Sequence, residues 1–120
     1  MITDLDENQF IVVGTNLAGS HGAGAAYQAL LNFGLAPGIG EGLSGKTYAF
    51  PTLERDMHKR GMRGLEKSRD RFLATARALP EKEFLMTAVG TGIAGYTHEE
   101  MKALFTDSPA NVVLPPEWTN

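Results

Sequence analysis

Two glycine-rich stretches hold the residues best suited to binding a ligand. The first, GTNLAGSHGAGAA at positions 14–26, carries Asn16 and His21, and the second, VGTGIAGY at positions 89–96, ends in Tyr96. Glycine has no Cβ, so a ligand can approach its backbone closely. Where such a loop opens a helix, unpaired N–H groups and the helix dipole favour an anion such as a phosphate. The sequence therefore indicates a phosphate site; the alternative is a pair of tight strand-to-helix connections with no ligand.

Few side chains in these stretches can take part in catalysis. His21 either acts as a general base near neutral pH or only bonds to the backbone or to a ligand phosphate. Asn16 either orients a ribose hydroxyl or a water, or caps the loop through bonds to the backbone. Tyr96 either encloses a ribose or packs on the end of the sheet. Neither loop contains a carboxylate or a cysteine, so we expect binding as the main activity, with any hydrolysis slow and dependent on Asn16 and His21.

A third glycine-rich segment, Leu35 to Lys46, is expected to be an irregular loop. With Thr47 its end matches the P-loop spacing G-x-x-x-x-G-K-[ST]. A P-loop follows a buried strand and opens a helix, whereas here the run from Thr47 to Phe50, followed by Pro51, predicts a strand. The spacing is therefore a weak indication of an ATP site. The one carboxylate of this segment, Glu41, is expected to be exposed on the surface.

The composition excludes several classes of function. With 120 residues, 42% hydrophobic and 21% charged, the chain is expected to form one domain over residues 1–120. The absence of cysteine excludes disulfides, thiolate catalysis and cysteine-based zinc sites, and His58 and His98 are too far from each other and from His21 for a metal motif. We therefore expect no metal and no cofactor. No apolar run approaches the ~18 residues of a membrane span, and no signal peptide is recognisable, so a cytoplasmic location without a membrane partner is expected.

The charge pattern argues against a nucleic-acid partner. The net charge is −3. Most of the lysine and arginine residues lie between Arg55 and Arg71, but Glu54, Asp56, Glu66 and Asp70 are interspersed with them. This pattern favours a solvated face over an anion-binding patch. The sequence does not indicate the oligomeric state.

The order of apolar and polar segments predicts how the two glycine stretches are positioned. Strands and helices alternate, which predicts a three-layer α/β/α domain with helices over a largely parallel or mixed sheet. Parallel strands bring both glycine loops to one carboxyl edge, where ligands bind. The buried stripe of the first helix is expected to be Ala26, Tyr27, Leu30 and Leu31. The predicted strands are Phe10–Val13, Thr47–Thr52, Glu83–Val89 and Asn111–Leu114, and Leu53–Gly64 is predicted to be a surface loop. The predicted helices are Ala23–Phe33, Leu65–Leu79 and one that begins after Thr97. This last helix is expected to bury Met101, Leu104 and Phe105 and to start with a capping box between Thr97 and Glu100.

The two glycine stretches resemble the two conserved blocks of macro domains, which bind ADP-ribose and in some members hydrolyse ADP-ribosyl linkages. The resemblance implies that Asn16 contacts the distal ribose and that residues 22–24 wrap the diphosphate. It implies that residues 91–96 form the second diphosphate loop, with Tyr96 near the distal ribose. The acidic residue that recognises adenine has no clear counterpart; Asp4 and Asp6 are the nearest candidates. The expected ligand-binding residues are Asn16, Gly19, Gly22, Ala23, Gly24, Gly90, Thr91, Gly92, Ile93, Ala94, Gly95 and Tyr96.

The chain also resembles, over nearly its whole length, a set of short phage and bacterial proteins. Their shared blocks are FGSNLAGxHGAGAA, YAIPT, GIAGY and an NVVLP segment followed by tryptophan; here they correspond to positions 13–26, 48–52, 92–96 and 111–118. In this chain we expect Trp118 to be a packing anchor. Two hypotheses follow from the resemblances. The first is binding of ADP-ribose or a related nucleoside diphosphate, with ADP-ribosyl hydrolysis as a further activity. The second is a phage-type accessory or interaction protein with no small-molecule activity.

Overall fold

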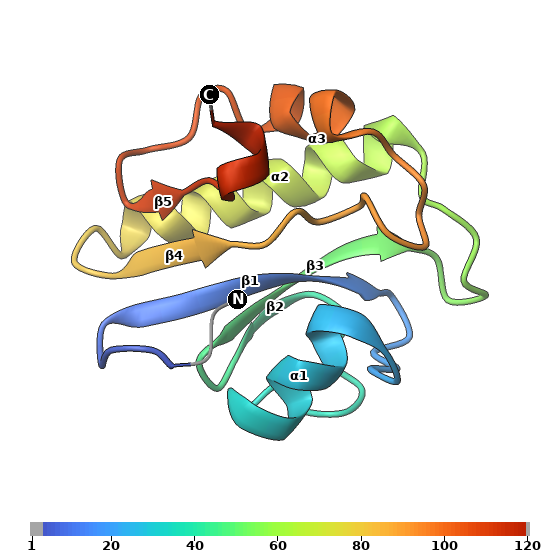
Figure 1. Cartoon of the computed structure of the whole chain (residues 1–120), viewed down its shortest axis with the longest axis horizontal. Helices are drawn as coiled ribbons and strands as arrows, with labels where there is room; N and C mark the ends of the chain where they lie inside the picture. Colours follow the sequence, from blue (N-terminus) through green and yellow to red (C-terminus); the bar gives the residue numbers. More distant parts are fainter. Residues whose placement is uncertain (1–3, 120) are drawn as a thin grey trace.

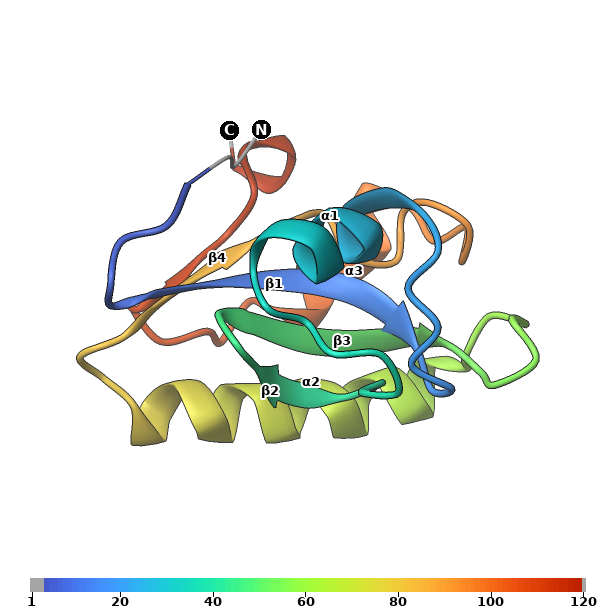
Figure 2. The same ribbon diagram turned by 90° about the horizontal axis from the view of Figure 1, so that it is seen from below.

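The computed structural model describes residues 4–119, which form an α/β fold around a five-stranded mixed sheet. The elements in chain order are β1 (Gln9–Asn16), α1 (Gly24–Asn32), β2 (Gly42–Ser44), β3 (Thr47–Leu53), α2 (Met62–Ala78), β4 (Glu83–Met86), α3 (His98–Leu104), β5 (Val112–Val113) and the 3₁₀-helix η1 (Pro116–Trp118). The strand order is β2-β3-β1-β4-β5, and neighbouring strands are parallel except for the antiparallel pair β2 and β3. α1 covers one face of the sheet, and α2 and α3 cover the other (Figures 1 and 2).

β1 lies at the centre of the sheet because its apolar run can be buried on both faces. Val12 and Val13 are fully buried and point to opposite sides. Val12 belongs to the larger core, in which the Phe72 ring lies 4.8 Å from the Tyr48 ring and 5.7 Å from the Phe84 ring. Val13 packs in the smaller core under α1. Alternating side chains of one strand therefore tie both helical layers to the sheet.

The predicted buried stripe of α1 is correct at Ala26, is only half-buried at Leu30, and is wrong at Tyr27 and Leu31. Tyr27 is 42% exposed and Leu31 is 56% exposed, whereas Ala26, Ala29 and Phe33 are buried against the sheet. The stripe is rotated by about one residue, because the short alanine side chains let the helix lie close to β1. The ends of the predicted helix agree with the structure to within one residue.

Helix α3 and the C-terminal segment pack as expected, with one correction. The predicted capping box is confirmed: Glu100 N–H donates to Thr97 Oγ1 at 3.0 Å, and Thr97 N–H donates to Glu100 Oε1 at 2.9 Å. Trp118 is buried, stacks on Phe105 with 5.8 Å between ring centroids, and donates its Nε1–H to His98 Nδ1. The packing anchor is therefore confirmed. The consecutive prolines Pro115 and Pro116 predict an end of regular structure, and this prediction is wrong, because η1 follows Pro115 and carries Trp118.

Several boundaries differ from the sequence-based predictions. β1 continues to Asn16, three residues beyond the predicted Val13, so the first residues of the glycine stretch belong to the strand. The segment from 35 to 46 is not wholly irregular, because β2 pairs with β3 in a tight hairpin in which Gly45 has a φ of +59°. α2 begins at Met62, inside the predicted surface loop. β4 ends at Met86, three residues before the predicted Val89, and the Val89 N–H then donates to the Thr87 carbonyl in a turn.

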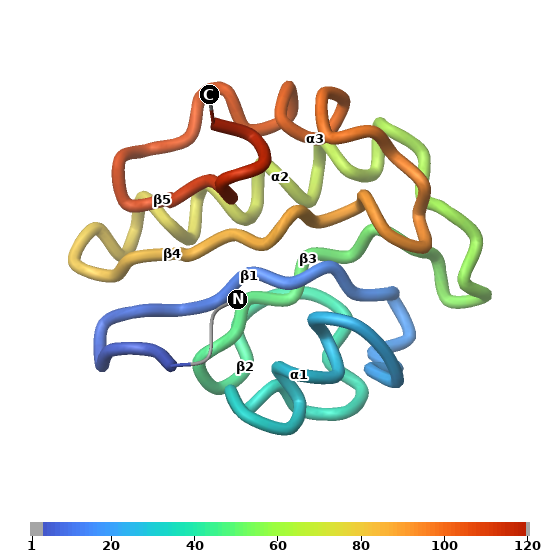
Figure 3. Tube along the Cα trace, viewed as in Figure 1, coloured from blue at the N-terminus to red at the C-terminus, as the bar shows by residue number. Residues whose placement is uncertain are grey.

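The chain leaves β1, β3 and β4 at the same end of the sheet. The arrows of these strands point the same way in Figure 1, and the tube in Figure 3 shows the loops before α1 and α3 at that end. The two glycine stretches are therefore brought to one carboxyl edge, as the predicted parallel pairing required.

Candidate functional site

A cavity of about 630 Å³ lies at this edge of the sheet, and both glycine stretches line it. Its volume is within the range of small-molecule sites. The wall consists of residues 14–16, 20, 22–26, 52, 53, 57 and 87–94. Of the predicted ligand-binding residues, it includes Asn16, Gly22, Ala23, Gly24, Gly90, Thr91, Gly92, Ile93 and Ala94, and it does not include Gly19, Gly95 or Tyr96.

The first loop leaves a run of backbone donors unpaired. Within the described residues, the N–H groups of residues 21–26 donate to no protein acceptor. α1 begins within this run; its N-cap, Ala23, has no side chain that can accept a hydrogen bond, and no acidic residue occupies the first turn. The positive end of the helix dipole is therefore uncompensated beside the cavity.

The second loop presents a similar run from the other side. Gly95 N–H donates to the Gly92 carbonyl and Tyr96 N–H to the Gly90 carbonyl, which closes the turn. In the described part of the chain, the N–H groups of residues 92–94 have no protein acceptor. Successive free N–H groups in a turn form a concave site that suits an anion. Two such runs therefore face one cavity.

The glycines at the cavity have room in front of them. A Cβ at Gly22, Gly24 or Gly92 would meet no atom within 4 Å. Crowding by the protein therefore does not explain why these positions are glycine. Gly24 has a φ of +63°, in the left-handed region, so its backbone conformation also favours glycine.

Asn16 has the loop-capping role that the sequence analysis gave as one of two alternatives. Its Nδ2 donates to the Ser20 carbonyl at 2.7 Å, and its Oδ1 accepts from the Ser20 N–H at 3.0 Å. The residue is buried at the end of β1 and lies on the cavity wall. Its amide therefore fixes the shape of the first loop, and the predicted contact with a ribose stays a prediction.

All but one of the other polar side chains of the wall are bonded to the protein. Thr15, Thr52, Thr87 and Thr91 all donate their hydroxyls to backbone carbonyls. None of the described wall residues is ionisable, and the Ser20 hydroxyl is the one hydroxyl of the wall that makes no hydrogen bond there. The cavity can therefore hold an anion through backbone donors, but its wall offers no side chain for proton transfer.

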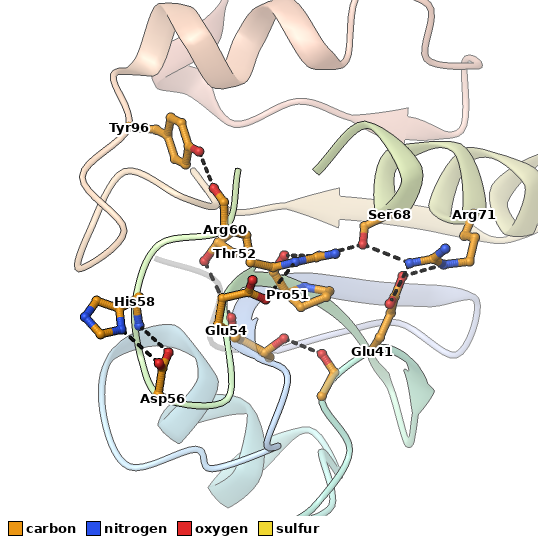
Figure 4. Close-up of polar contacts among 12 residues, drawn as sticks. Glu41, Pro51, Thr52, Glu54, Asp56, His58, Arg60, Ser68, Arg71 and Tyr96 are labelled. Atoms are coloured by element: carbon orange, nitrogen blue, oxygen red, sulfur yellow. Dashed lines mark hydrogen bonds and ion pairs between the residues drawn. The ribbon is translucent and has the colours of Figure 1, made fainter. Parts of the chain in front are cut away.

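His21 and Tyr96 lie behind the wall. His21 is only 6% exposed, and neither ring nitrogen has a hydrogen-bond partner within the described residues. Tyr96 is also buried, and its hydroxyl donates to the Arg60 carbonyl (Figure 4). Burial raises the pKa of the Tyr96 hydroxyl above its ordinary value of 10.0, and the nearby Glu100 carboxylate raises it further. A catalytic role of His21 stays a prediction, and it requires the ring to leave its present position.

The third glycine-rich segment, residues 35–46, packs against the backbone of the first. A Cβ on Gly19 would lie 2.3 Å from the carbonyl carbon of Gly38, and one on Gly40 would lie 2.6 Å from the Asn16 carbonyl oxygen. Gly38 N–H also donates to the Gly19 carbonyl. Gly19 is therefore a backbone-packing position and not part of the wall. The P-loop context is absent, because Thr47 opens β3 and not a helix.

Glu41, expected to be exposed, is instead held in an ion pair. Its two carboxylate oxygens accept from Arg71 Nε at 2.8 Å and from Arg71 Nη2 at 2.9 Å (Figure 4). The bidentate pair links the segment just before β2 to helix α2. Glu41 does not line the cavity.

Sequence reasoning missed the part of the wall that follows β3. Thr52, Leu53 and Met57 line the cavity, although residues 53–64 were predicted to be a surface loop. The available signal was the strand order: a strand parallel to β1 and beside it also ends at the carboxyl edge. The sequence alone did not show which strands are neighbours.

Two further observations concern metal sites and membrane-spanning helices. Within residues 4–119, no cluster of three or more histidine, aspartate or glutamate side chains has the arrangement of a metal site. None of the helices in that range is long and apolar enough to cross a bilayer.

Comparison with known proteins gave no match. No protein-family model matches the sequence, and neither a curated protein nor a solved structure matches the chain. Function is therefore inferred from the geometry of the cavity and from the two sequence blocks quoted above.

Proposed function

We propose that this protein binds ADP-ribose or a related nucleoside diphosphate in the cavity between the two glycine loops. The observation that carries the proposal is the pair of unpaired N–H runs, residues 22–26 and 92–94, on the wall of one cavity. A diphosphate carries acceptor oxygens on both phosphates, so it can bond to both loops at once. Hydrogen bonds from N–H groups to an ionised phosphate are about twice as strong as neutral ones.

The arrangement of the loops supports a macro-domain-like fold as part of the same proposal. The asparagine block begins in the last residues of β1, the Gly-Ile-Ala-Gly-Tyr block lies in the loop after the neighbouring β4, and helices lie on both faces of the sheet. This is the context that the resemblance implies for a three-layer domain. The wall has no acidic side chain for adenine, so the proposal covers related nucleoside diphosphates as well as ADP-ribose.

We propose binding, and not turnover, as the main activity. General acid–base catalysis needs a titratable group within hydrogen-bond reach of the reacting atoms. The wall contains none, and the His21 ring is buried behind it. Turnover of an ADP-ribosylated substrate by the wild type, Asn16→Ala and His21→Ala would test this. Fast turnover that survives both substitutions would place the catalytic group elsewhere.

Calorimetric titration with ADP-ribose tests the binding proposal. In Gly22→Val and Gly92→Val, the new side chain would enter open space at the cavity without a positive φ to strain it. We expect each variant to lose at least about tenfold in affinity, which corresponds to about 1.4 kcal/mol, while its melting temperature stays close to that of the wild type.

Gly61→Thr is the matched control. A Cβ at Gly61 also meets open space, but this residue is the N-cap of α2 and lies outside the cavity. Threonine has the shape of valine and is favourable at an N-cap. The control should bind like the wild type. Unchanged affinity in folded Gly22→Val and Gly92→Val would contradict the proposal.

One observation favours the second candidate, an interaction protein. Tyr27 and Leu31 lie one turn apart on the exposed side of α1. If none of ADP-ribose, NAD or AMP raises the melting temperature of the wild type, this surface becomes the first place to look for a binding partner.

A further inference from the structure

We propose that Met57 is the contact surface for the nucleobase, and that the site detects the presence of a base without distinguishing one base from another. This inference rests on the proposed function, and it concerns the part of the cavity that the glycine loops do not form. Met57 lines the cavity from the loop after β3, and so does Leu53 at the end of that strand. Its side chain is 45% exposed and therefore has surface that a ligand can cover.

The backbone of Met57 is in a conformation that methionine rarely adopts. Its φ is +73°, and among the described residues it is the one non-glycine residue with a positive φ. The left-handed region is costly for a side chain with a Cβ, and glycine or asparagine occupies it more readily. Methionine at this position therefore costs stability, and an apolar side chain facing a ligand cavity is a reason to retain it.

The loop around Met57 is held firmly in this conformation. Glu54 N–H donates to the His58 carbonyl at 2.7 Å, and Met57 N–H donates to the Glu54 carbonyl at 3.0 Å. Below this turn, Leu53 and Lys59 form an antiparallel bridge. The His58 ring contacts the Asp56 carboxylate at 3.0 Å (Figure 4). The hydrogen bond from His58 lowers the pKa of Asp56.

Arg60 fastens the base of the same loop to three other parts of the molecule. Its N–H donates to the Thr52 carbonyl at 3.0 Å. Its Nη1 donates to the Pro51 carbonyl at 2.9 Å and to Ser68 Oγ at 2.8 Å (Figure 4). Its own carbonyl accepts from the Tyr96 hydroxyl, at the end of the second glycine loop. Met57 is therefore a preset part of the wall, and its position is fixed relative to the loop proposed to hold the diphosphate.

The chemistry of this part of the wall suits a flat apolar group. The methionine thioether is polarisable and packs well against aromatic rings. Of the two wall residues at the end of β3, Thr52 has its hydroxyl bonded to the Thr15 carbonyl, and Leu53 is apolar. Among the described wall residues, the one side-chain donor or acceptor without a protein partner is the Ser20 hydroxyl of the first glycine loop, and the wall segment after β3 contributes none to read the edge of a base. The contact is therefore non-directional, and this is why we infer tolerance among bases.

Titrations with ADP, GDP and inorganic pyrophosphate test the inference. For the wild type we expect ADP and GDP to agree within about threefold, and both to bind at least about tenfold more tightly than pyrophosphate. In Met57→Asn, the affinities for ADP and GDP should fall to near that of pyrophosphate, whereas pyrophosphate binding should change by less than about twofold. The melting temperature of Met57→Asn should rise, because asparagine tolerates the left-handed conformation.

Met57→Leu is the companion variant. It keeps an apolar side chain and the same backbone cost, so it should bind ADP within a few-fold of the wild type. Unchanged ADP binding in Met57→Asn, an equal loss for ADP and pyrophosphate, or a strong preference between ADP and GDP would each overturn the inference and leave the proposed function standing. If the wild type binds none of the three probes but binds ADP-ribose, this inference falls and the proposed function stands; if it also fails to bind ADP-ribose, both fall.

Discussion

Gly24 combines two requirements in one residue. It is the first residue of α1 beside the cavity, and its φ of +63° lies in the left-handed region. The sequence suggested that Gly24→Val would affect binding more than folding. The φ value changes that expectation: a β-branched residue there should cost about 1–2 kcal/mol of stability as well as blocking the anion. Urea denaturation compared with Gly22→Val checks this, and equal stability of the two variants would contradict it.

His21 carries a buried ring whose two nitrogens lack partners within the described residues. An unsatisfied buried polar group costs about 1–3 kcal/mol, and removing it with an apolar group of similar size can be neutral or stabilising. We therefore expect His21→Leu to unfold at an equal or higher urea concentration than the wild type. His98→Leu is the contrast, since it removes the acceptor of the Trp118 indole and should destabilise. A clear loss of stability in His21→Leu would show that the ring has a partner, such as a bound water.

Among the elements, α3 is a short helix whose start depends on its capping box. Thr97→Ala removes the acceptor for the Glu100 N–H, and we expect it to cost about 1 kcal/mol. The loss should appear as a lower denaturation midpoint. The Thr97→Ser variant keeps a hydroxyl that can accept this bond, so it should stay close to the wild type.

The same capping box makes part of the stability depend on pH. The hydrogen bond from the Thr97 N–H lowers the pKa of Glu100 below its ordinary value of 4.5. A carboxylate with a lowered folded-state pKa stabilises the fold above its unfolded pKa, and loses this effect as the pH falls through the folded value. The stability difference between the wild type and Glu100→Gln should therefore be full at neutral pH and shrink below about pH 4.5. A difference that does not vary between neutral and acidic pH would contradict the assignment.

Elements that depend on neighbouring residues could be predicted from the sequence. The α3 cap follows from Thr97 and Glu100, three residues apart, and β1 and β3 follow from apolar runs. The face of α1 could not be predicted in the same way: Tyr27 and Ala29 are both apolar, and contact with β1 decides which of them is buried. β2 was missed because its three residues become a strand only by pairing with β3.

The residues of the cavity also differ in whether the local sequence predicts their role. Its two glycine loops could be found from composition and from the strand-to-helix context. The wall after β3 could not, because Met57 reaches the cavity only through the strand order and a tertiary loop. Gly19 was assigned to the ligand because nothing in the local sequence shows that Gly38 packs against it. His21 could be considered as a general base, beside the alternative that it only bonds to the backbone or a phosphate, because the local sequence does not show that its ring is buried.

For the molecule as a whole, the basic segment between 55 and 71 should not be a nucleic-acid site. Several of its cations already have acidic neighbours: Arg71 pairs with Glu41, Arg69 with Asp70, and Arg60 lies 3.8 Å from Glu54. Together with the net charge of −3, these pairs reduce the positive field of this face. Fluorescence polarisation with duplex and single-stranded oligonucleotides should give dissociation constants weaker than about 10 μM at physiological salt. Tighter binding with a steep dependence on salt would refute this.

The close backbone packing behind the first loop also bears on how such a protein can change over generations. Variants at Gly19 and Gly40 would place atoms on top of a neighbouring backbone, so in a randomised library they should be lost as unfolded protein before any selection for binding. Variants at Gly22 and Gly92 should survive as folded protein with a cavity of a new shape. Glycine therefore occurs here both at positions that tolerate no substitution and at positions on the cavity that do. The same fold can acquire a different ligand by single substitutions at the second kind of position.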